Sequence, residues 1–91
     1  MITVYSKAGC GYCEMAKKYL KDNNFEFEEV RVDLNEDKRQ WLFENGYRTV
    51  PQIFYKDVLL VRGGGMELTV TKPEFIKSKM EIIDANNSIV L

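Results

Sequence analysis

Two strand-like segments with a helical segment between them constrain the fold of this chain most strongly. Residues 2–5 (ITVY) are β-branched or aromatic, as in a short strand, and residues 25–34 (FEFEEVRVDL) alternate apolar and charged side chains with the period of a half-covered strand. Between them, apolar residues recur at the spacing of one helix face, at Tyr12, Ala16, Tyr19 and Leu20. A strand, a helix and a strand in this order require a right-handed crossover, so the two strands are predicted to be parallel.

A second helix and a close pair of strands are predicted next. Asn35 is a suitable N-cap for residues 36–45 (EDKRQWLFEN), which carry acidic residues in the first turn, and Gly46 follows them. Residues 51–55 (PQIFY) and 58–62 (VLLVR) then have the composition of two strands. Only two residues separate them, and because neither is glycine the turn signal is weak. So short a connection nevertheless allows only antiparallel pairing.

The last predicted element is a third helix. Gly63, Gly64 and Gly65 separate it from the strands, and Thr71 with Glu74 has the pattern of a capping box. One apolar face then continues to about Asn86, at Phe75, Ile76, Met80 and Ile83. The predicted order is β-α-β-α-β-β-α, which indicates an α/β fold with a mixed four-stranded sheet flanked by three helices.

Length and charge exclude several classes of protein. A chain of 91 residues suits one small domain, so we expect a single domain over residues 1–91. Its 13 basic and 14 acidic residues are interspersed, which argues against nucleic acid or an anionic membrane as a partner. Without an N-terminal signal pattern or an apolar run near the ~20 residues of a membrane helix, a cytoplasmic location is expected. We also expect a monomer.

Cys10 and Cys13 are the only cysteines, and the chain has no histidine. A zinc site needs about four ligands, or three and a water molecule, so this pair is too small for a closed metal site within one chain. A structural disulfide across so short a loop would constrain the unfolded chain little and would be reduced in the cytosol. Both readings are therefore weaker than that of a reacting dithiol.

The position of the pair favours redox chemistry. If the helix begins near Gly11, the thiol of Cys10 lies at its N-terminus, where free N–H groups and the helix dipole favour thiolate, the form that attacks disulfides. Lys7 adds a nearby positive charge. Cys13 lies about one turn further along the helix and is expected to be better shielded. Cys10 is predicted to be the nucleophile and Cys13 the resolving thiol.

Three motifs in this order resemble those of the glutaredoxins, which have a thioredoxin-like fold. They are CGYC (residues 10–13), TVPQIF (residues 49–54) and the glycine pair within GGGMEL (residues 63–68). The similarity runs from Ile2 to about Leu68. This chain has glycine where dithiol glutaredoxins commonly have proline after the first cysteine, and it keeps the tyrosine of that motif.

The resemblance implies a glutathione groove beside the dithiol. Tyr12 would form one wall, and Pro51 would be cis and face the cysteines. The backbone of Val50 would then be free to pair with the cysteinyl part of glutathione like an added strand, supported by Thr49. Lys7 would bind the glycyl carboxylate.

The resemblance also implies contacts at the two ends of glutathione. Lys38 and its neighbour Arg39 fall where the family has a second polar or basic contact from the second helix. Three N–H groups would meet the γ-glutamyl carboxylate, those of Gly64, Gly65 and Met66. The family often carries an aspartate where this chain has Met66. A shift of one residue would let Glu67 supply that carboxylate.

The implied activity is reduction of protein disulfides and glutathione mixed disulfides, with glutathione as co-substrate and ribonucleotide reductase as a plausible protein substrate. One alternative is a redoxin recharged by thioredoxin reductase instead of glutathione. Another is a dimer bridged by a [2Fe–2S] cluster, in which Cys10 of each chain and two glutathione molecules supply the four sulfur ligands. No other metal ligand is predicted.

Overall fold

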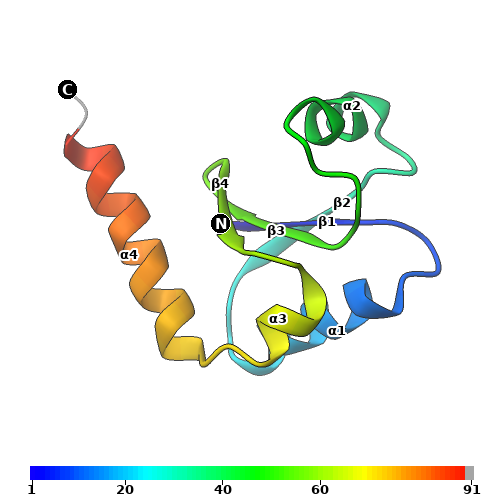
Figure 1. The fold of residues 1–91 in the computed structure, drawn as a ribbon. Helices are drawn as coiled ribbons and strands as arrows, with labels where there is room; N and C mark the ends of the chain where they lie inside the picture. The colour runs from blue at the N-terminus through cyan, green and yellow to red at the C-terminus, as the bar shows by residue number, and fades with distance from the viewer. Residues whose placement is uncertain (90–91) are drawn as a thin grey trace.

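One mixed sheet of four strands, in the spatial order β2-β1-β3-β4, organises the molecule (Figure 1). The computed structural model describes residues 1–89, and the last two residues of the predicted domain lie outside this range. Strand β1 pairs parallel with β2 and antiparallel with β3, and β3 pairs antiparallel with β4. The elements are β1 (Ile2–Ser6), α1 (Gly11–Asp22), β2 (Phe27–Arg31), α2 (Glu36–Glu44), β3 (Gln52–Tyr55), β4 (Val58–Val61), α3 (Gly65–Thr69) and α4 (Pro73–Ile89). The predicted α/β class and mixed sheet are confirmed.

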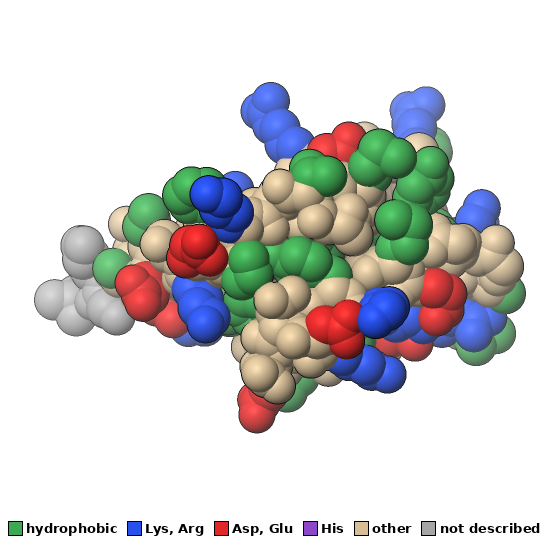
Figure 2. Space-filling model, turned by 90° about the horizontal axis from the view of Figure 1, so that it is seen from below, with side chains coloured by type: hydrophobic (Ala, Val, Ile, Leu, Met, Phe, Trp, Pro, Cys, Tyr) green, Lys and Arg blue, Asp and Glu red, His purple; other side chains and the backbone are tan. Residues whose placement is uncertain are grey.

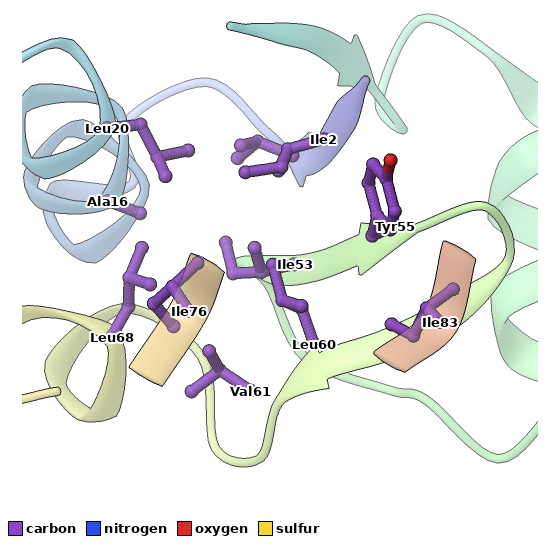
Figure 3. Packing of buried hydrophobic residues seen from close by; sticks show 11 residues of the cluster. Ile2, Ala16, Leu20, Ile53, Tyr55, Leu60, Val61, Leu68, Ile76 and Ile83 are labelled. Atoms are coloured by element: carbon purple, nitrogen blue, oxygen red, sulfur yellow. The ribbon is translucent and has the colours of Figure 1, made fainter. Parts of the chain in front are cut away.

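Helices cover both faces of the sheet. Alternate side chains of β1 point to opposite faces, so Val4 belongs to one hydrophobic cluster and Tyr5 to the other. The larger cluster joins the sheet to α1, α3 and α4, and Figure 3 shows Ala16, Leu68 and Ile83 among the side chains that form it. On the opposite face, α2 is attached through aromatic packing, with Trp41 5.5 Å from the ring of Phe54. Figure 1 shows α2 on one side of the sheet and α1 with α3 on the other.

The glycine-rich segment differs from the sequence prediction. Three helices were expected, but the described residues form four, because a short helix, α3, follows Gly64. Leu68 in this helix is completely buried, and this anchors a turn too short to show a helical period in the sequence. The predicted capping box at Thr71 is also wrong, because α4 begins at Pro73 and Thr71 therefore lies one residue before the N-cap position. The Thr71 hydroxyl donates a hydrogen bond to the carbonyl of Glu67 at 2.6 Å. Helix α4 begins at Pro73 and continues past Asn86 to Ile89.

The two-residue connection between β3 and β4 is a tight turn despite its lack of glycine. Lys56 and Asp57 both have positive φ, at 50° and 63°, as in the hairpin turns that match the twist of paired strands. The Lys56 ammonium donates to a carboxylate oxygen of Asp84 in α4 at 2.6 Å, and the hydroxyl of Tyr55 donates to the same oxygen at 2.9 Å. The hairpin and α4 therefore hold each other in place.

The surface carries no broad area of one charge on the face that Figure 2 shows, where acidic and basic side chains alternate with apolar ones. Among residues 1–89, no helix combines the length and the apolar character needed to cross a membrane.

A buried hydroxyl and two charged side chains connect α1 to the sheet near the end of β1. Ser6, which is completely buried, donates to the carboxylate of Glu29 at 2.6 Å, and the Lys17 ammonium donates to the same oxygen at 2.9 Å. The hydrogen bond from Ser6, followed by that from Lys17, lowers the pKa of Glu29. Because the folded chain favours the charged form, this carboxylate stabilises the fold above its unfolded pKa of about 4.3.

We expect this contribution to be lost as the pH falls through the lowered pKa of Glu29. The wild type should therefore lose more of its unfolding free energy between about pH 6 and about pH 3 than Glu29→Gln does. Urea unfolding at a series of pH values measures the difference. Parallel pH curves for the two proteins would contradict the assignment.

Candidate active site

The two cysteines occupy the start of α1 in different environments. Cys10 is the N-cap residue, in an extended conformation, and its sulfur accepts a hydrogen bond from the backbone N–H of Cys13 at 3.2 Å. The two residues form a disulfide with their Cα atoms 5.2 Å apart. Cys10 is half-buried, whereas Cys13 is only 1% exposed. An incoming sulfur atom therefore has access to Cys10 and not to Cys13.

The loop that leads to Cys10 is held by the chain after β2. A carboxylate oxygen of Asp33 accepts a hydrogen bond from the N–H of Ala8 at 3.3 Å. The Arg31 guanidinium donates to both oxygens of Asp33, at 2.8 and 2.6 Å, and lowers the pKa of that carboxyl to about 2. Asp33 is therefore charged at neutral pH and restrains the loop before the reactive thiol.

The segment before β3 lies directly beside the dithiol. The Val50–Pro51 peptide bond is cis, as the resemblance implied, and the carbonyl oxygen of Val50 lies 3.9 Å from the sulfur of Cys10. The buried amide of Gln52 donates to the carbonyl of Thr49 at 2.9 Å and approaches its hydroxyl at 3.3 Å. Gln52 thereby fixes the conformation of Thr49 and Val50 next to Cys10.

A groove of about 330 Å³ adjoins this segment. One wall is Tyr12, whose ring is half exposed at the start of α1. The other predicted residues that line the groove come from the two remaining motifs, and they are Thr49, Val50, Pro51, Gly65, Met66 and Glu67. The structure thus brings together residues of all three motifs. Within the described part of the chain, Glu67 carries the only charged side chain that lines the groove.

Two glycines allow the backbone segments around the groove to meet. Gly64 has a φ of +93°, and a Cβ atom on it would lie 2.5 Å from the carbonyl oxygen of Pro51. A Cβ atom on Gly65 would lie 2.5 Å from the carbonyl oxygen of Tyr12. Gly64 does not line the groove itself, but it holds α3 against the cis-proline segment. Both positions therefore require glycine for contact between segments of this chain, before any ligand is considered.

A second hollow, of about 470 Å³, shares Thr49 and Val50 with the groove. Of the described residues, three with cationic side chains line it, Lys7, Arg39 and Arg48, and none with a carboxylate does. Lys7 therefore lines this hollow and not the groove, whereas Glu67 lines the groove and not this hollow.

Of the two neighbouring basic residues on α2, Arg39 faces the hollow and Lys38 does not. The Lys38 ammonium lies 5.6 Å from the centre of the Trp41 ring, and its residue lines neither the groove nor the hollow. Sequence reasoning did not select Arg48, whose guanidinium lies 4.9 Å from the centre of the Phe43 ring. Its only signal was its position directly before Thr49 in the TVP motif.

A half-exposed thiol at a helix N-terminus, a shielded partner thiol and a cis-proline beside them define a thiol–disulfide oxidoreductase site of the thioredoxin-fold type. Comparison with known proteins supports this assignment of the site. The profile of the Glutaredoxin family matches residues 2–60 of this chain, which therefore belongs to the glutaredoxin family. As a member of that family it is a thiol–disulfide oxidoreductase.

Individual relatives fall into two groups. The glutaredoxin-like protein NrdH of Lactococcus lactis is 37% identical over 57 residues, which span 63% of this chain and 79% of that protein. Human mitochondrial glutaredoxin-2 is 42% identical over 57 residues, or 58% of this chain and 35% of that protein. Among solved structures, the glutaredoxin-like NrdH-redoxin of Escherichia coli matches with a TM-score of 0.65 and 25% identity, covering 85% of this chain and 91% of that one.

Gly65→Ala tests the backbone contact beside the groove. We expect the added methyl group to cost roughly 1–3 kcal/mol of unfolding free energy, because it displaces the carbonyl of Tyr12 or moves α3 away. Gly11→Ala is the matched control, since a Cβ there meets nothing within 4 Å and the residue begins α1. Urea unfolding of both variants should separate them, and equal stabilities would show that the contact at Gly65 carries no constraint.

Proposed function

We propose that this chain is a dithiol glutaredoxin that uses glutathione to reduce protein disulfides and glutathione mixed disulfides. The observation that supports this most strongly is the convergence of Tyr12, the Thr49–Pro51 segment and residues 65–67 on one groove beside Cys10. The cysteine of glutathione would lie against the backbone of Val50, within reach of the reactive sulfur.

The charges around the Thr49–Val50 segment fit the two ends of glutathione. Glutathione carries a carboxylate at its glycyl end, and an ammonium and a second carboxylate at its γ-glutamyl end. With the cysteinyl part on Val50, the glycyl carboxylate would reach Lys7 and the ammonium would reach Glu67. The N–H groups of Gly64, Gly65 and Met66 remain the proposed contacts of the γ-glutamyl carboxylate. Lys38 lines neither the groove nor the hollow, so the geometry gives no support to its predicted contact with glutathione.

The proposed reaction has two branches. With a glutathione mixed disulfide, the Cys10 thiolate attacks the glutathione sulfur, the substrate thiolate leaves with the electron pair, and a second glutathione thiolate then releases oxidised glutathione from Cys10. With a protein disulfide, Cys10 forms a mixed disulfide with the substrate, and Cys13 attacks Cys10 to release the reduced protein. This leaves the Cys10–Cys13 disulfide that the structure contains. Two glutathione molecules then regenerate the dithiol.

We propose a cytoplasmic location, because a reducing compartment would keep this dithiol active. Ribonucleotide reductase remains a proposed protein substrate, although no residue of this chain identifies it. The single domain and the monomeric state also remain proposals.

A redoxin recharged by thioredoxin reductase is the second candidate. Two observations favour it: the similarity to NrdH proteins, one of which is described by a thioredoxin-like activity profile, and Met66 in place of the aspartate common in glutaredoxins. Under this alternative the groove would bind a protein segment in place of glutathione, and the dithiol chemistry would be unchanged.

The [2Fe–2S] dimer also remains a proposal. The described residues contain no group of three or more cysteine, histidine or acidic side chains able to hold a metal. Cys13 is nearly inaccessible, so Cys10 is the one thiolate that a chain presents to a shared cluster. The donor set fits only if glutathione supplies the other sulfur ligands, as that hypothesis requires.

Coupled assays on cysteine variants test the function. With a small glutathione mixed disulfide, glutathione and glutathione reductase, we expect turnover by the wild type, background rates for Cys10→Ser and retained turnover for Cys13→Ser. Reduction of a protein disulfide should require both cysteines. Equal loss of both reactions in both variants would contradict the assigned roles.

The reductant is tested in the same assays by replacing glutathione and its reductase with thioredoxin reductase. Turnover only with thioredoxin reductase would establish the second candidate and remove the proposed glutathione contacts at Lys7 and Glu67.

A further inference from the structure

The cationic hollow beside the dithiol carries more positive charge than one glycyl carboxylate needs. Lys7, Arg39 and Arg48 line it, and within residues 1–89 neither Lys7 nor Arg48 is in an ion pair. Arg39 approaches Glu36 at 3.8 Å, and both of these side chains are largely exposed. Such a long exposed contact leaves most of the Arg39 charge available to a ligand.

The direction of a bound chain decides which part of a substrate meets these charges. An added strand that pairs antiparallel with Thr49 and Val50 runs from the groove toward Arg48. The proposed glutathione pose has the same direction, with its γ-glutamyl end near Glu67 and its glycyl end near Lys7. Residues that follow the reactive cysteine of a substrate therefore enter the cationic hollow, and residues that precede it pass Glu67.

Strand geometry limits how far from the cysteine the charges lie. Each residue of an extended chain advances about 3.3 Å, so the first one to three residues after the cysteine fall within the hollow. The hollow is bounded on its other side by a site where Asp33 and Glu36 join Lys7 and Arg39. Carboxylates on the substrate are consequently favoured near Arg48 and disfavoured near Asp33 and Glu36. Arg48 is suited to this contact because the Phe43 ring, 4.9 Å from its guanidinium, supports it.

We propose that this protein selects protein substrates whose reactive cysteine is followed, within about three residues, by acidic side chains. Arg48, which the glutathione pose does not use, is the specificity-determining residue. The proposal rests on the proposed dithiol function of Cys10, and it assigns the hollow to a protein substrate in addition to glutathione.

Peptides with an activated cysteine test the proposal. The Cys13→Ser variant attacks a peptide cysteine carried as a 2-pyridyl disulfide: a bond forms between Cys10 and the peptide sulfur, the old disulfide breaks, and pyridine-2-thione leaves with the electron pair and is measured by absorbance. Three peptides are compared, with Glu-Glu, Gln-Gln or Lys-Lys after the cysteine. Each rate is divided by the rate of the same peptide with dithiothreitol, which removes differences in intrinsic reactivity.

We expect the normalised rate of the acidic peptide to exceed that of the neutral one roughly three- to tenfold, and the basic peptide to be slowest. Arg48→Gln, made in the same background, should bring the acidic-to-neutral ratio close to one, whereas Lys79→Gln, an exposed change on α4, should leave it unaltered. The ratio should also shrink when the ionic strength rises from about 0.02 M to about 0.5 M. Moving Glu-Glu to the positions before the cysteine should abolish the advantage, because those residues pass Glu67.

Equal normalised rates for the acidic and neutral peptides would overturn the proposal, as would an acidic preference that persists in Arg48→Gln. Failure of the proposed function gives a different result. Cys10 would then react with none of the peptides faster than the background rate, whatever the charge of the peptide.

Discussion

Three backbone segments meet at Gly64 and Gly65 with no side chain between them, and the geometry of the site depends on this contact. Gly65 lies against the carbonyl of Tyr12 in α1, and Gly64 lies against the carbonyl of Pro51. Leu68 fixes the short helix α3 that carries these glycines in the hydrophobic core. The dithiol, the cis-proline segment and residues 65–67 therefore form one packed unit, and the hydrophobic core fixes the positions of the groove walls.

The sheet brings the parts of this unit to the same end of the molecule. Tyr5 in β1 pairs with Gln52 in β3, so the loop that follows β1 and the segment that precedes β3 leave the sheet side by side. This register explains how the sulfur of Cys10 comes within 3.9 Å of the carbonyl of Val50, forty positions later in the chain. Asp33 and Gln52 then hold the two segments through hydrogen bonds to Ala8 and Thr49.

Charge around the dithiol is divided by the Thr49–Val50 segment. Among the residues that the structure describes, Glu67 is the only one with a charged side chain that lines the groove, and three cations and no carboxylate line the hollow. Because the net charge of the chain is only −1 and its charges are interspersed, this local separation is not visible in the composition. It gives a bound extended chain a preferred direction, since opposite charges at the two ends are favoured in only one orientation.

The order of the four strands and of helices α1, α2 and α4, the parallel crossover and the position of the dithiol followed from the sequence alone, because they depend on local periodicity, on capping at residues such as Asn35 and on the handedness of the crossover. Other features were decided only by tertiary packing. Helix α3 exists because Leu68 is buried, and Thr71 bonds to Glu67 because α3 lies beside it. Arg39 and not Lys38 faces the hollow, because consecutive helix residues point in directions about 100° apart. A motif match that is uncertain by one residue cannot distinguish the two. Packing of Leu68 into the core and the orientation of α2 against the sheet decide these features, and no hydropathy pattern along the sequence specifies either of them.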